Sequence, residues 1–113
     1  MTSTAEVEAL IARQRERTVA RIAALTRDFE ALIESTDSAD DEHDPEGATA
    51  AFERAQVAAL ISQARAQLTE LDHARERLDD GTYGVCGRCG RPIAVERLRA
   101  RPTARTCELD RTS

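Results

Sequence analysis

The stretch that decides the fold is residues 57–78, VAALISQARAQLTELDHARERL. Its apolar residues recur at alternating intervals of four and three, a spacing that places side chains along one seam of a coiled-coil helix. An arginine occupies one position of the series, at residue 75. The stretch predicts a long helix that ends at about Asp79, with these seam residues: Val57, Ile61, Ala64, Leu68, Leu71, Arg75 and Leu78.

A similar seam precedes it. Residues 4 to about 35 contain neither proline nor glycine, and Thr4 is a suitable N-cap with acidic residues in the first turn after it. An apolar patch near the start lies out of the later register, because Gln14 and Arg15 interrupt it. The patch is Val7, Leu10 and Ile11, and the later seam is Thr18, Ile22, Leu25, Phe29 and Leu32.

A polar, acidic stretch over residues 35–47 separates the two seams. Asp44 followed by Pro45 is typical of an N-cap and the first residue of a helix. Two seams of similar length joined by a short loop fold most simply as an antiparallel helical hairpin. We therefore predict a mainly α protein, with a coiled-coil hairpin over residues 1–80 and its tip at about residues 36–48.

Charge divides the chain. Nine acidic residues lie between Asp28 and Glu46, and no arginine lies between Arg27 and Arg54. From Tyr83 onward arginines outnumber acidic residues, so the hairpin is expected to have an acidic tip and a basic base. The net charge of −5 argues against bulk phosphate binding, and an aromatic content of 3% excludes a stacking platform for single-stranded nucleic acid.

No apolar run approaches the roughly 20 residues that a membrane span requires, and no signal peptide opens the sequence. We therefore expect a cytoplasmic protein without a membrane partner.

All three cysteines lie in the last third of the chain. Cys86, Cys89, Cys107 and Asp110 have the spacing C-x2-C-x17-C-x2-D. This is the spacing of a four-cysteine zinc site in which a carboxylate replaces the fourth thiolate. We expect one structural Zn²⁺ on these four residues, in a small zinc-finger module over residues 81–113. Its affinity should be lower than that of an all-thiolate site, and the module has few apolar residues to hold it together without metal.

Two other interpretations of the cysteines stay open, a redox dithiol at Cys86 and Cys89 and a finger that packs without metal. A catalytic zinc is not indicated, because no H-E-x-x-H or H-x-E pattern supplies a general base. An EF-hand beginning at Asp37 fails at Glu42 and Ala48. No catalytic triad or phosphate-binding loop occurs, so the sequence gives no case for an enzyme.

The cysteine region resembles a known family, the DksA/TraR zinc-finger transcription regulators. The motifs that carry the resemblance are Gly81-Thr-Tyr-Gly-Val-Cys86-x-x-Cys89-Gly90-x-Pro92-Ile93 and Arg97-Leu98-x-Ala100-Arg101-Pro102-x-Ala104-x-x-Cys107. The resemblance implies RNA polymerase as the partner, a coiled-coil tip inserted through its secondary channel, and the alarmone ppGpp as a frequent co-regulator. It also implies that the protein does not read DNA sequence directly.

This sequence departs from the family pattern at two places. Asp110 stands where the family has its fourth cysteine. The family's tip motif D-x-x-D-x-A becomes Asp44-x-x-Gly47-x-Thr49, or Asp41-x-x-Asp44-x-Glu46 when the alignment is shifted by three residues. The resemblance makes Asp41, Asp44 and Glu46 the tip candidates, and Arg88, Arg91, Arg97 and Arg101 the candidates for docking at the base.

The arginines of the base also have an intramolecular interpretation, in which Arg97 and Arg101 pair with Glu76, Asp79 or Asp80. Two rival functions remain as well. One is a coiled-coil adaptor or dimer with a structural or vestigial finger, and the other is a thiol sensor that releases metal on oxidation.

Overall fold

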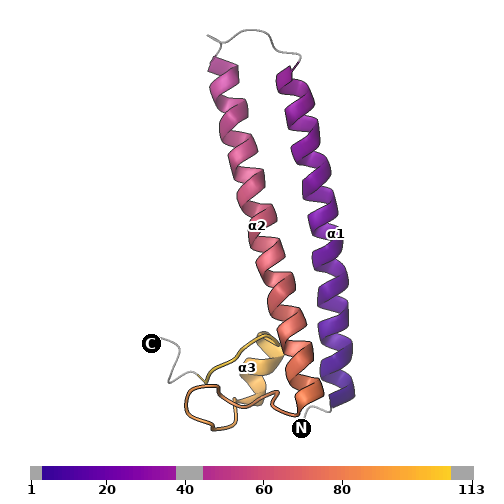
Figure 1. Cartoon of the computed structure of the whole chain (residues 1–113), viewed down its shortest axis with the longest axis vertical. Helices are drawn as coiled ribbons and strands as arrows, with labels where there is room; N and C mark the ends of the chain where they lie inside the picture. The colour runs from indigo at the N-terminus through magenta and orange to yellow at the C-terminus, as the bar shows by residue number, and fades with distance from the viewer. Residues whose placement is uncertain (1–3, 38–44, 108–113) are drawn as a thin grey trace. The chain divides into compact units, whose positions relative to one another are not determined.

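The computed structural model describes residues 4–37 and 45–107, which are mainly helical. Helix α1 runs over Thr4–Asp37, α2 over Pro45–Asp80 and α3 over Val95–Ala100 (Figure 1). Within the described ranges the extended pairing is one antiparallel bridge, between Val85 and Pro92. The predicted mainly α fold is confirmed, and α2 begins at the proline that the sequence indicated.

The chain divides into two compact units, and both long helices contribute to each. The first unit is Met1–Glu16 with Leu68–Ser113, and the second is Arg17–Gln67. The finger therefore belongs to the same unit as the first part of α1 and the last part of α2. No helix in the described part of the chain combines the length and the apolar character needed to cross a membrane.

The core of the first unit lies between the two helices. Val7 and Ile11 of α1 pack with Leu71 and Ala74 of α2, and Leu71 and Ala74 are both 0% exposed. Low residue numbers on α1 face high numbers on α2, so the two segments are antiparallel. Burial of one such leucine side chain contributes about 1.5–3 kcal/mol.

The seam of α2 departs from prediction at one position. Arg75 was predicted to fill it, but Arg75 is exposed and its Nε lies 3.9 Å from Oδ1 of Asp79. Ala74 takes the buried place instead. Ala74 packs with Val7, Ile11 and Leu71, and Leu78 and Tyr83 lie against the same cluster, so the residue before the predicted seam position is the buried one.

The sequence analysis expected Gln14 to interrupt the seam of α1. In the structure the seam continues through it. Val7, Ile11, Gln14 and Thr18 continue a four-three-four spacing, and Gln14 is half-buried. Gln14 is therefore a polar member of the seam. Arg15 beside it is exposed, and its Nε donates to Oδ1 of Asp72 at 2.9 Å.

The second unit is also an antiparallel pair of helix segments, and it contains the predicted later seam. Its α1 seam residues and Val57 and Ile61 of α2 are half-buried, while Ala64 is 6% exposed. Thr26 and Phe29 line one hollow together with Ala58 and Ile61, which fixes the pairing of the two segments. Each helix segment has one helical partner in this unit, so its seam is covered from one side. The predicted coiled-coil seam is confirmed.

Candidate metal centre

The finger begins where α2 ends. Gly81 has a φ of +78°, a left-handed conformation that glycine adopts without steric cost. The amides of Thr82 and Tyr83 then donate to the carbonyl oxygen of Arg77, at 2.9 and 3.1 Å. These bonds satisfy a carbonyl at the helix C-terminus and turn the chain away from the helix axis.

The Cys86–Cys89 knuckle is held by its own backbone. The amide of Cys86 donates to the carbonyl of Arg91 at 2.8 Å, and the amide of Gly90 donates back to the carbonyl of Cys86 at 3.0 Å. Gly90 has a φ of +73°, which permits this tight turn. A further hydrogen bond, from the amide of Ile93 to the carbonyl of Gly84, is 2.7 Å long and joins the two chain segments that flank the knuckle.

The three cysteines come together. Their sulfur atoms all lie within 4.8 Å of one another, and Sγ of Cys89 is 3.7 Å from Sγ of Cys107. Tetrahedral zinc with Zn–S bonds of about 2.3 Å separates its sulfur ligands by about 3.8 Å. No disulfide joins the cysteines. The three thiolates therefore fit one zinc ion, with Cys86 buried, Cys107 half-buried and Cys89 exposed.

Cys107 is delivered by residues 102–107, which we call the strap. The strap forms neither helix nor strand. The carbonyl groups of Pro102, Thr103, Arg105 and Thr106 accept hydrogen bonds from other parts of the first unit. The hydroxyl of Tyr83 donates to the carbonyl of Pro102 at 2.8 Å, and Nε of Arg97 donates to that of Thr106 at 2.9 Å. The amide of Gly87, inside the knuckle, donates to the carbonyl of Arg105 at 2.9 Å.

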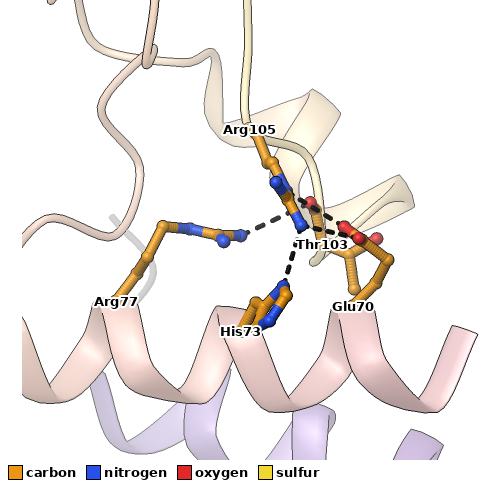
Figure 2. Close-up of polar contacts among 5 residues, drawn as sticks. All are labelled: Glu70, His73, Arg77, Thr103 and Arg105. Carbon is orange, nitrogen blue, oxygen red and sulfur yellow. Dashed lines mark hydrogen bonds and ion pairs between the residues drawn. The ribbon is translucent and has the colours of Figure 1, made fainter. Parts of the chain in front are cut away.

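Side chains of α2 hold the strap from the other side. Figure 2 shows Glu70, His73 and Arg77 on one face of α2, directed toward Thr103 and Arg105. Nε of Arg105 donates to Oε2 of Glu70 at 3.0 Å, and one terminal nitrogen donates to Oε1 at 2.6 Å. That terminal nitrogen is also 2.9 Å from Nδ1 of His73. Because a guanidinium can only donate, Nδ1 of His73 is the acceptor.

Arg77 extends the same network. A terminal nitrogen of Arg77 donates to the carbonyl of Thr103 at 3.4 Å. Burial lowers the pKa of the Arg77 guanidinium, the nearby Arg105 cation lowers it further, and Glu70 opposes both effects. The Glu70 carboxylate, which binds Arg105, thus offsets part of the repulsion between the two guanidinium groups.

Tyr83 offers a test of how the finger packs on α2. Burial raises the pKa of its hydroxyl, and the Arg77 cation offsets part of that rise. The folded state therefore holds this proton more tightly than the unfolded state. The resulting stability is present below the unfolded pKa of about 10 and is lost as pH rises through the folded pKa.

The expected result is a tyrosinate absorbance titration whose midpoint lies higher in the folded protein than in denaturant. The chain has one tyrosine and no tryptophan, so the signal belongs to Tyr83 alone. Identical midpoints in the two states would show that the hydroxyl is not buried against the strap.

The arginines predicted to dock at the base take different places. Arg88, Arg91 and Arg101 are exposed, whereas Arg97 is half-buried and donates to the strap. The intramolecular alternative paired Arg97 and Arg101 with Glu76, Asp79 or Asp80. The contacts that the structure gives for the described residues are different ones: Arg97 donates to the carbonyl of Thr106, and Asp79 lies beside Arg75. Arg105 and Arg77 fasten the finger to α2 in their place.

Sequence reasoning missed Glu70, His73, Arg77 and Arg105. The first three have a spacing that places them on one face of α2, off the apolar seam, a position that a periodicity argument assigns to solvent. Three of the predicted site residues, Asp41, Asp44 and Asp110, lie outside the described residues. Glu46 lies in α2, but its side chain is likewise outside the description.

Antiparallel helix segments followed by a site of three clustered cysteines define a class of helical zinc-finger proteins. A family profile described as the prokaryotic dksA/traR C4-type zinc finger matches residues 81–108. The solved structure of transcription factor DksA2 from Pseudomonas aeruginosa is similar with a TM-score of 0.80 and 33% sequence identity, over 92% of this chain and 76% of that one. The chain belongs to the DksA/TraR family.

Other relatives match a smaller part of this chain. YteA of Bacillus subtilis is 41% identical over 69 residues, which are 61% of this chain and 29% of YteA. The RNA polymerase-binding transcription factor DksA of Caulobacter vibrioides is 48% identical over 40 residues, 35% of this chain and 28% of that protein. The chain thus matches less than a third of the length of these two relatives.

Proposed function

We propose that this protein is a transcription regulator that binds RNA polymerase. The observation that carries the proposal is the similarity to transcription factor DksA2, which extends over 92% of this chain and includes both long helices as well as the finger. The name of the Caulobacter relative, an RNA polymerase-binding factor, supports the same partner. Its compartment would be the cytoplasm, where bacterial transcription takes place.

In this proposal the hairpin tip enters the secondary channel of the polymerase. Asp41, Asp44 and Glu46 would act there through their negative charge, near the catalytic magnesium or the mobile elements around it. At the other end, the exposed side chains of Arg88, Arg91 and Arg101 are available for the channel rim. Sequence-specific DNA contacts are not required, and ppGpp is a candidate co-regulator.

Zinc would have a structural role. Cys86, Cys89 and Cys107 would hold it, and we assign the fourth position to Asp110. When bound, the metal cross-links the knuckle to the strap, which stabilises a module of few apolar residues. The three clustered thiolates and the four-cysteine family pattern support this role. We therefore propose regulation rather than catalysis.

The test is a pull-down with core RNA polymerase and competition with another secondary-channel factor. Wild-type protein is expected to bind at micromolar concentration and to be displaced by the competitor. Absence of binding would refute the proposal. A stable dimer that does not bind polymerase would support the coiled-coil adaptor instead.

Neutralising the tip separates binding from regulation. The triple variant Asp41→Asn, Asp44→Asn, Glu46→Gln is expected to bind polymerase within a few-fold of wild type but to lose its effect on promoter transcription, because shape and base contacts are unchanged. The matched control neutralises Glu8, Glu16 and Glu76, which are exposed and belong to the first unit. Equal transcriptional effects of wild type and the tip variant would contradict the assigned role.

A further inference from the structure

We propose that Glu70 and His73, acting through Arg105, are positioning residues for the metal ligand Cys107. The affinity of the finger for zinc would then depend on contacts with α2, and zinc would in turn fasten the strap to that helix. The inference rests on the metal site proposed above and is independent of polymerase binding.

Arg105 connects α2 to the backbone of the knuckle and to the segment that carries Cys107. Its side chain donates twice to Glu70 and once to His73, so α2 fixes the guanidinium in position. Its carbonyl accepts the amide of Gly87, which lies between Cys86 and Cys89. Two residues further along the chain is Cys107, whose sulfur lies 3.7 Å from that of Cys89. One residue thus contacts the helix, the knuckle and the segment that ends in the third ligand.

The strap depends on such contacts, because it has no regular secondary structure of its own. The hydrogen bonds that the described residues make to Pro102, Thr103 and Thr106 are accepted by backbone carbonyl groups, not by side chains of the strap. Arg105 is the residue of the strap whose side chain the structure pairs with α2. Its two parallel bonds to Glu70 fix direction as well as distance, as a planar guanidinium on a carboxylate does. Removing them frees the strap to take positions in which Cys107 no longer meets the other two sulfurs.

The coupling is reciprocal by thermodynamic necessity. If the contact between Arg105 and α2 raises zinc affinity by some factor, bound zinc strengthens that contact by the same factor. Loss of residues that orient metal ligands typically lowers metal affinity 10- to 100-fold. The Arg105–Glu70 pair is half-exposed, so the expected effect is at the lower end, about tenfold.

The experiment measures zinc affinity by competition with a chromophoric chelator, and ligation by the thiolate-to-metal absorption of the Co²⁺ form. Arg105→Gln and Glu70→Gln are each expected to weaken zinc binding about tenfold. The control Arg99→Ala removes an exposed arginine of α3 and should bind as wild type does. The charge exchange Glu70→Arg with Arg105→Glu should recover most of the lost affinity, which a general loss of stability would not allow.

A second readout is thermal. Zinc is expected to raise the melting temperature of wild-type protein by more than it raises that of Arg105→Gln. Equal zinc affinities in wild type, Arg105→Gln and Glu70→Gln would overturn the inference and leave the metal site intact. A wild-type protein that binds no zinc would overturn the metal site and the inference with it. Should Arg105→Gln fail to fold, Glu70→Gln decides the question, because it leaves the guanidinium and its other contacts in place.

Discussion

Replacing Leu71 with alanine is expected to lower the free energy of unfolding by about 3 kcal/mol. Leu71 is 0% exposed, in the cluster where α1 and α2 meet in the first unit. The truncation removes apolar contacts and leaves a cavity that two paired helices can close only in part. A domain of this size is typically stable by roughly 5–15 kcal/mol, so the loss is a large fraction of the total.

Urea denaturation followed by far-ultraviolet circular dichroism measures the change. Val19→Ala is the control, because Val19 lies on α1 with 44% of its surface exposed. Its effect is expected to stay within about 0.5 kcal/mol. If both variants shifted the urea midpoint equally, the helices would not be held together by the core described above.

The seams of the long helices could be predicted because their signal is local and repeated. Ile61, Leu68 and Leu71 follow the four-three spacing, and all three are buried or half-buried. The start of α2 could be predicted as well, because the fixed φ of proline suits the first helical position and its missing N–H group is not needed there. Spacing also predicted that Cys86, Cys89 and Cys107 would share one site, and their sulfur atoms do meet.

The details that sequence could not supply depend on the partner helix. Gln14 was interpreted as a break because polar residues are uncommon in a seam, yet the four-three-four spacing through it is intact. Arg75 and Ala74 are adjacent, and which of them is buried depends on the rotation of α2 against α1. A pattern with a fixed repeat does not contain that rotation.

The strap shows the same limit for the site. Arg105 and Glu70 are 35 residues apart, and neither belongs to a motif that indicates a contact. Their pairing follows from the path of residues 102–107 over α2, which is set by the bonds from Tyr83, Arg77 and Gly87. Arginines of the finger therefore looked equivalent in sequence, whereas in the structure some hold the strap and others are exposed.

Replacing Cys86 with serine is expected to weaken zinc binding by on the order of a hundredfold. Structural zinc sites contribute roughly 10–16 kcal/mol, so one of four ligands accounts for about 3 kcal/mol. Serine has nearly the same shape, but its hydroxyl is not ionised at neutral pH and is a poor zinc ligand. Cys86 is 1% exposed, so solvent has little access to replace the missing thiolate. Metal content after dialysis and competition with a chelator measure the loss.

Asp110→Ala is the informative comparison, because it removes the predicted fourth ligand and leaves the three clustered thiolates. Its effect should be smaller than that of Cys86→Ser, since water can complete the tetrahedron at the fourth position, as it does in open zinc sites. Glu96→Ala, at an exposed position in the first turn of α3, controls for the loss of one carboxylate. If Asp110→Ala matched Glu96→Ala, Asp110 would not be a ligand. If Cys86→Ser retained wild-type zinc affinity, Cys86 would not be a zinc ligand and the site of three clustered thiolates would be wrong.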